Sequence, residues 1–196
     1  MKDHKDQVHR GWAKFLNPES LRGNLIAASI YLAAFEVLQS SVIDRIRGFF
    51  SNDFKDGKPL ESEDYRSHCL ALAKSPFRAS LLWLKKMSAI SDDDIALVDR
   101  IREHRNAIAH NLPEFLGTAD TEVNVQLLAN IHELVAKIDR WWIQEVDMTI
   151  SPEYDGREIP ADQISSGNML FIQMMLQIAT GEESGELWEQ FQKHFG

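Results

Sequence analysis

The sequence has very little cysteine and none of the common motifs that bind a metal ion or a nucleotide. Cys69 is the only cysteine among 196 residues, so the chain cannot form an internal disulfide. No second Cys or His pair stands at the spacing of a structural zinc site, and neither a Gly-rich phosphate loop nor an HExxH sequence is present. We therefore expect a protein of a reducing compartment that uses no metal and no cofactor.

Basic residues are also scarce, with 21 Lys and Arg against 30 Asp and Glu and a formal net charge of -9. This charge argues against a protein that coats nucleic acid or an anionic membrane, so any nucleic-acid site must be a local patch. The first twenty residues carry charges throughout, which argues against a signal peptide, and we expect no stretch to reach the roughly 18 apolar residues of a membrane span. These features predict a cytoplasmic protein that makes no use of a membrane.

The sequence is dominated by helical patterns. The segment 21–50 contains no proline and is apolar on nearly every face between Leu25 and Leu38, which is typical of a central buried helix. Apolar residues at helical spacing recur in three later segments, 76–90, 91–112 and 122–146. Because short breakers join these segments, we predict an all-α protein, an antiparallel bundle of four to six helices.

The length of the chain favours one domain, since 196 residues can bury one good core and are few for two. We expect a single helical domain over 1–196, with its core at about 18–146 and a short helical extension at about 147–196. Within the extension we expect two helices, at 168–179 and at 185–194. We also expect a small hairpin formed by residues 147–150 and 157–160.

The helix that Pro113 closes carries an unusual arginine. At about 100° per residue, its apolar residues fall on one face, and Arg105 lies near the middle of that face. Asn106 and His110 are neighbours on an adjacent stripe because they are four residues apart. Arg105 and His110 are about 140° apart on an ideal helix, so they converge only at a helix end, at a bend or around a cleft. Asn111 and Pro113 predict a helix end at this point.

The pattern Arg-Asn-x-x-x-His at a helix end resembles the signature of the HEPN superfamily, small helical-bundle domains with an Arg, four to six residues and then a His. Arg105, Asn106 and His110 match it residue by residue. By helix order the resemblance covers about 21–146. It implies an HEPN-like fold and a metal-independent endoribonuclease that works on RNA as a homodimer. It also implies a toxin–antitoxin or anti-phage setting, in which an antitoxin or another protein is a further partner.

The chemistry of RNA cleavage fits the residue types of this motif. A reaction without metal needs a group that titrates near neutral pH to take the proton of the 2′-OH, and the imidazole of His110 suits this task. The guanidinium of Arg105 binds a phosphate through two parallel hydrogen bonds and stabilises the charge that develops on it. Asn106 is expected to orient the imidazole or to donate to the phosphate.

Three further residues are expected to support this site. Arg102 and His104 would add local positive charge to an acidic protein, and the alternative is a solvated face paired with neighbouring carboxylates. Glu36 stands in the apolar sequence YLAAFEVL, so we expect its carboxylate to be buried and to position the guanidinium of Arg105. The alternative for Glu36 is a purely structural ion pair.

Other interpretations of the sequence remain open. His68 and Cys69 are two components of a thiol site, but no third group accompanies them, which favours a packed cysteine. Trp141 and Trp142 are expected to be core and subunit contacts rather than platforms for bases. For the whole chain, the alternative to a ribonuclease is a non-catalytic helical interaction module whose Arg–His pair stabilises a dimer.

Overall fold

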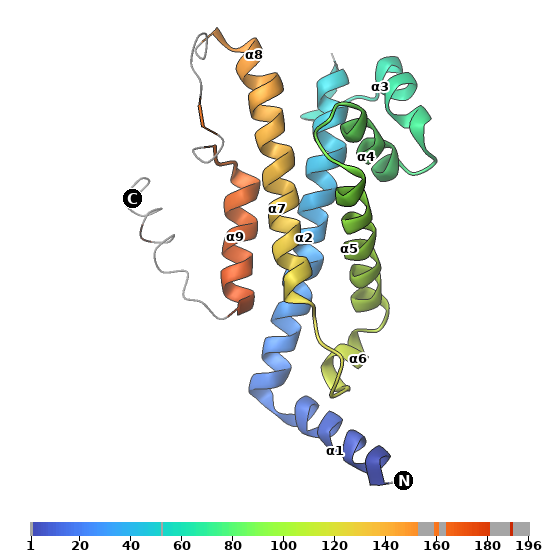
Figure 1. The fold of residues 1–196 in the computed structure, drawn as a ribbon, viewed down its shortest axis with the longest axis vertical. Coiled ribbons are helices and arrows are strands. Elements are labelled where there is room, and N and C mark those ends of the chain that lie inside the picture. Colours follow the sequence, from blue (N-terminus) through green and yellow to red (C-terminus); the bar gives the residue numbers. More distant parts are fainter. Residues whose placement is uncertain (1, 52, 153–158, 161–163, 181–188, 190–196) are drawn as a thin grey trace. The chain divides into compact units, whose positions relative to one another are not determined.

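The computed structural model describes the chain except residues 1, 52, 153–158, 161–163, 181–188 and 190–196 (Figure 1). The described residues form an all-α helical bundle, which confirms the predicted fold class. The elements are, in chain order, α1 (Lys2–Leu16), α2 (Pro18–Phe50), β1 (Phe54–Lys55), β2 (Lys58–Pro59), α3 (Glu63–His68), the 3₁₀ turn η1 (Leu70–Leu72), α4 (Pro76–Lys86), α5 (Asp92–His110), α6 (Leu112–Gly117), α7 (Val125–Trp142), the π-turn η2 (Ile143–Asp147), α8 (Met148–Ile150) and α9 (Gly167–Thr180).

The chain divides into two compact units. Unit 1 consists of Met1–Phe35, Arg100–Ile131 and Phe171–Gly196, and unit 2 of Glu36–Asp99 and His132–Leu170. The helices α2, α5, α7 and α9 contribute residues to both units. The organisation of the chain as one domain stays a prediction.

The core of unit 1 is built on one face of α2. Tyr31, Ala34 and Phe35 are buried there, and the Tyr31 hydroxyl donates to the carbonyl oxygen of Ile101 at 3.2 Å, which satisfies a buried polar group. Ala28 of α2 is buried as well, and further buried apolar side chains of this core come from α5, α6, α7 and α9, namely Ile101, Ile108, Phe115, Leu128, Ile131, Ile172 and Met175. This core holds the second half of α5, which carries the predicted site.

The burial of α2 is narrower than its sequence predicts. Leu25 and Ile26 are exposed, although they begin the stretch that we expected to be buried. Ser29 and Ala33 are exposed as well and share a face, because they are four residues apart. Because the exposed stripe of α2 consists of small and apolar residues, the sequence of this helix resembles that of a helix buried on every face.

α2 also bears on the expectation that no segment could span a membrane. By length and composition this helix is suited to cross one, contrary to that expectation. However, 39% of its most apolar window is buried inside the protein, and the core helix of a globular protein has the same composition. The helix is therefore weak evidence in either direction.

α1, a helix that was not predicted from the sequence, contacts α6 in unit 1 (Figure 1). Two glycines lie at this contact. Gly11 is buried, and a Cβ atom at this position would overlap the carbonyl oxygen of Gly117. The Lys14 ammonium group donates to the carbonyl oxygens of Thr118 at 3.1 Å and Thr121 at 2.6 Å. The close approach of Gly11 to Gly117 and these two hydrogen bonds fix α1 beside the end of α6.

We expect Gly11→Ala to destabilise the contact between α1 and α6, because its methyl group would meet the Gly117 carbonyl. Gly23→Ala is the matched control, since nothing lies within 4 Å of a methyl group there, and alanine in a helix is usually more stable than glycine by about 0.5–1 kcal/mol. Thermal unfolding should show a lower Tm for the first variant only, and hydrogen exchange should speed up along α1. A rise in Tm in both variants would contradict the close approach.

In unit 2, aromatic side chains gather around Trp142. This residue is 1% exposed, and its ring stacks on Trp83 with centroids 5.9 Å apart and planes 17° apart. Phe49 and Trp141 contact the same indole at centroid distances of 5.5 Å and 5.0 Å. The predicted core role is confirmed for Trp142, whereas Trp141 is only half-buried.

A fully buried carboxylate, Asp139, connects three elements of unit 2. The Arg45 guanidinium of α2 lies 3.9 Å from it and also forms an ion pair with Asp147 of η2. The Ser166 hydroxyl donates to Asp139 and accepts the backbone N–H of Met169 at 3.1 Å, so it caps the start of α9. Asp139 thereby ties α7 to α2 and to the residues that begin α9.

The strand predictions were wrong where the structure tests them. In unit 2, β1 and β2 form an antiparallel hairpin of two-residue strands in a segment where no strand was predicted, with Asp56 and Gly57 at positive φ in its turn. The residues 147–150, expected as a strand, are helical. α9 confirms the predicted helix at 168–179, whereas 185–194 lies outside the described residues apart from Glu189.

Candidate functional site

α5 begins and ends where its sequence predicts. Ser91 precedes its first turn, and its hydroxyl accepts the Asp94 N–H at 3.2 Å while the Asp94 carboxylate accepts the Ser91 N–H at 2.7 Å. The helix ends at His110, Asn111 leaves the helical conformation with φ -123° and ψ 32°, and α6 follows at once. The predicted motif therefore occupies the last turns of a regular helix.

Arg105 lies on the apolar face of α5, as predicted. Ile101 and Ile108, four residues before it and three after it, are fully buried, and Arg105 itself is half-buried. Its guanidinium carbon is 5.5 Å from the centre of the Phe35 ring of α2, a cation–π distance. The guanidinium also donates to the side-chain oxygen of Asn106 at 3.4 Å. These contacts orient the guanidinium at the edge of the core of unit 1.

His110 and Asn106 are both exposed on α5. The helix stays regular through His110, so the side chains of Arg105 and His110 leave it about 140° apart. The structure brings Arg105 together with Asn106 and leaves His110 on a different face of the helix. A phosphate that meets both residues of one chain would have to reach around the end of α5.

His104, predicted to add positive charge, has a structural role instead. Its Nε2 accepts the backbone N–H of Asn124 at 2.9 Å, which requires a neutral ring protonated at Nδ1. The ring also contacts Tyr31 and Phe115 edge to face, at centroid distances of 4.9 Å and 5.7 Å. Burial lowers the pKa of His104 below its usual 6.5. This histidine therefore connects α2, α5, α6 and the residue before α7.

The lowered pKa of His104 predicts a loss of stability in acid. The unfolded chain binds the proton more tightly than the folded chain, so the stabilisation is complete above about pH 6.5 and decreases as the pH falls below it. Urea unfolding at pH 7.5 and at pH 5 should show a smaller pH dependence for His104→Gln than for the parent protein. His132, whose pKa burial also lowers, remains in both proteins and contributes equally to each. An unchanged pH dependence in the variant would contradict the role of His104.

Arg102 and Glu36, the other two residues expected to support the site, are both exposed. Arg102 is exposed on α5, in agreement with a surface cation. Glu36 is exposed on α2, so the expectation of a buried carboxylate was wrong. Glu36 continues the exposed stripe of Ser29 and Ala33, which explains the error. Glu36 belongs to unit 2 and Arg105 to unit 1, and an action of the carboxylate on the guanidinium stays a prediction.

The alternative thiol site at His68 and Cys69 is a packed cysteine. Cys69 is fully buried, its sulfur lies 3.8 Å from the Ser80 hydroxyl, and burial raises the pKa of the thiol, which makes it a poor nucleophile. His68 is exposed and its ring stacks on Phe50 at a centroid distance of 5.9 Å. Within the described part of the chain, no group of three or more His, Cys, Asp or Glu side chains could hold a metal ion.

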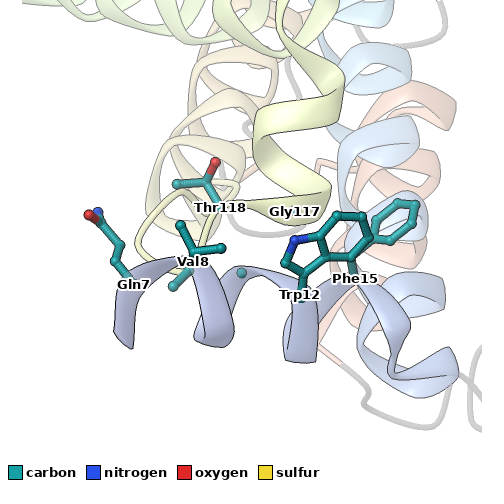
Figure 2. A pocket seen from close by; sticks show the side chains of 8 residues that line it. Gln7, Val8, Trp12, Phe15, Gly117 and Thr118 are labelled. Atoms are coloured by element: carbon teal, nitrogen blue, oxygen red, sulfur yellow. The ribbon is translucent and has the colours of Figure 1, made fainter. Parts of the chain in front are cut away.

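A groove in unit 1, between α1 and the end of α6, was not predicted from the sequence (Figure 2). Its volume is about 460 Å³. The lining residues are Gln7, Val8, Gly11, Trp12 and Phe15 of α1 with Gly117, Thr118 and Ala119. The signal was present in the sequence, because Val8, Trp12 and Phe15 stand at the i, i+4, i+7 spacing of an apolar helix face.

Comparisons of the chain with known protein families, with curated proteins and with solved structures give no match. The fold and the candidate site therefore define the class of the protein: an all-α helical bundle with a half-buried arginine and an exposed histidine on one helix.

Proposed function

We propose that the protein is a metal-independent endoribonuclease of the HEPN type. The observation that carries the proposal is the contrast between Arg105, oriented by Phe35 and Asn106, and His110, exposed at the end of the same helix. A guanidinium that is already oriented loses little conformational entropy when it binds a phosphate. An exposed imidazole is accessible to the ribose of a large substrate.

In the proposed reaction, neutral His110 takes the proton from the ribose 2′-OH. The 2′ oxygen attacks the adjacent phosphorus, the bond from phosphorus to the 5′ oxygen breaks, and the leaving oxygen takes a proton from water. The products are a 2′,3′-cyclic phosphate and a 5′-OH end. Arg105 stabilises the negative charge that develops on the phosphate oxygens, and Asn106 holds the guanidinium.

The proposed active form is a homodimer in the cytoplasm. Because Arg105 and His110 leave α5 about 140° apart, one helix end presents the two groups poorly to a single phosphate. A two-fold axis beside the 102–110 surface would place Arg105 of one copy near the partner's His110 and give two equivalent sites. A toxin–antitoxin or anti-phage role, with an antitoxin or another protein as regulator, follows from the resemblance alone.

The test of the proposal is to incubate the purified protein with total RNA in EDTA and to analyse the ends of the products. Cleavage that leaves 2′,3′-cyclic phosphates, by a protein whose mass in light scattering is that of a dimer, supports the proposal. A protein that leaves every RNA intact, at protein concentrations where it is dimeric, contradicts it.

A second function is favoured by one observation. The contacts of Arg105 with Phe35 and Asn106 are those of a structural residue, and they need no substrate to explain them. The chain would then be a non-catalytic interaction module, in which the motif stabilises a dimer. This alternative predicts that Arg105→Ala lowers the Tm or dissociates the dimer, and that the parent protein has no activity on RNA.

A further inference from the structure

Trp12 lies in the groove between α1 and α6 with most of its indole accessible. Its side chain is 59% exposed, and Figure 2 shows it beside Phe15 with the backbone of Gly117 opposite. The rings of Trp12 and Phe15 meet edge to face, with centroids 6.2 Å apart and planes 84° apart. An indole that is held in place in a groove and still accessible provides a flat surface on which a planar group can stack.

The walls of the groove are fixed independently of Trp12. Gly11 and Gly117 set the closest approach of α1 to α6, and the Lys14 ammonium holds the loop after α6 through the carbonyl oxygens of Thr118 and Thr121. The groove therefore has a defined width before any ligand binds. A substitution of Trp12 changes its lining and leaves these contacts unchanged.

α1 is a basic segment of an acidic protein. Its sequence, KDHKDQVHRGWAKFL, holds four Lys and Arg against two Asp, whereas the whole chain has a formal net charge of -9. Lys5, His9 and Arg10 are exposed. On an ideal helix, Lys5 and His9 lie on the same side as Trp12, seven and three residues away from it. A cation such as Lys5 beside an exposed aromatic ring forms a surface that suits an anionic ligand with planar rings.

The groove also lies a short distance along the chain from the candidate catalytic histidine. α6 begins two residues after His110 and ends at Gly117, which lines the groove. Six helical residues span about 9 Å, so His110 and the groove are placed at opposite ends of one short helix. A flexible polyanion that passes His110 can follow α6 to the groove.

We propose that this groove binds an unpaired base of single-stranded RNA, which stacks on Trp12 while Lys5 contacts a neighbouring phosphate. The occupant is single-stranded, because the bases of a duplex are stacked on each other and do not enter a groove between helices. The inference rests on the proposed function in naming RNA as the ligand. It goes further by assigning a binding subsite, a substrate form and the residues of α1 that recognise it.

The experiment measures binding by the full-length chain with the His110→Ala substitution, so that the RNA stays intact. The probes are a fluorescent 12-nucleotide oligouridylate and a blunt RNA duplex of 12 base pairs, followed by anisotropy. Trp12→Ala should weaken binding of the single strand by roughly 5–150-fold, the range found when an aromatic residue that stacks on a base is removed. Trp12→Phe should retain most of the affinity, and the duplex should bind weakly to every variant.

Two controls separate stacking from other effects. Leu16→Ala removes another exposed apolar side chain of α1 that does not line the groove, and it should leave the affinity unchanged. Lys5→Ala should reduce the slope of log affinity against log salt by about 0.7 for the lost phosphate contact.

The outcomes distinguish this inference from the proposed function. Binding that depends on Trp12, in a chain whose parent form never cleaves RNA, supports the subsite and contradicts the nuclease. If the parent chain cleaves RNA and Trp12→Ala does not change the affinity for the single strand, the subsite is contradicted and the proposed nuclease function is supported. If Trp12→Ala changes the oligomeric state in light scattering and not the RNA affinity, the groove is a protein interface and the inference is overturned.

Discussion

His110→Ala is expected to lower RNA cleavage by about 10²–10⁴-fold, the contribution of a general base, without loss of stability. The side chain is exposed at the last position of α5, so its removal leaves no cavity in the core. Far-ultraviolet circular dichroism and the Tm should match those of the parent protein. The cleavage rate, measured in EDTA on one synthetic RNA, should fall by the stated factor.

The control for this variant is Asn111→Ala, which removes the adjacent exposed side chain and should keep most of the activity. Arg105→Ala is a poorer probe, because Arg105 is half-buried against Phe35 and its loss affects stability as well as catalysis. Full activity in a folded His110→Ala protein would exclude His110 as the base.

Trp142→Ala is expected to lower the free energy of unfolding by about 3–5 kcal/mol, the usual cost of removing a large buried aromatic side chain. The indole is 1% exposed and contacts Trp83, Phe49 and Trp141, so its removal leaves a cavity in unit 2. Urea unfolding monitored by circular dichroism would measure the change. The fluorescence signal is unsuitable, because the substitution alters it directly.

Trp142→Phe tests the same site with a smaller change. Within the part of the chain that the structure describes, the buried Nε1 of Trp142 has no hydrogen-bond partner, so phenylalanine removes ring volume together with an unsatisfied donor. We expect a much smaller loss than for alanine. Trp141→Ala, at a half-buried position, should also cost less. Equal losses in all three variants would contradict the central position of Trp142.

The sequence predicted α5 well because several local signals agree there. Ser91 and the aspartates after it mark the start, the apolar spacing marks the face that Arg105 shares, and Asn111 with Pro113 marks the end. Each signal depends on residues within a few positions of one another. Local agreement of this kind does not require knowledge of the partner helices.

Glu36 and His104 were misplaced because their environment depends on distant segments. Glu36 follows the buried Phe35, but the face it occupies is exposed, and the apolar residues on both faces of α2 hide this difference. His104 stands three residues after Ile101 and four before Ile108, a spacing compatible with burial. Its contacts with the rings of Tyr31 and Phe115 and with the N–H of Asn124 show that it is structural.

The groove was missed for a related reason. α1 is too charged to be recognised as a core helix, and its place is set by the approach of Gly11 to a carbonyl oxygen about one hundred residues later. No pattern within α1 indicates that approach. The apolar spacing of Val8, Trp12 and Phe15 could have predicted an amphipathic helix, but not what lies across from it.

The π-turn after α7 changes the direction in which the side chains at its end leave the helix. On a regular α-helix, Asp139 and Asp147 would be about 80° apart, since they are eight residues apart. Each residue of a π-turn advances less about the helix axis, so η2 turns Asp147 back toward the side of Asp139, where Arg45 pairs with both. The pairing thus depends on the number of residues in η2 as well as on their identity. Deleting one residue of η2 before Asp147 would rotate Asp147 and α8 about the helix axis, whereas exchanging one for a residue of similar size would not.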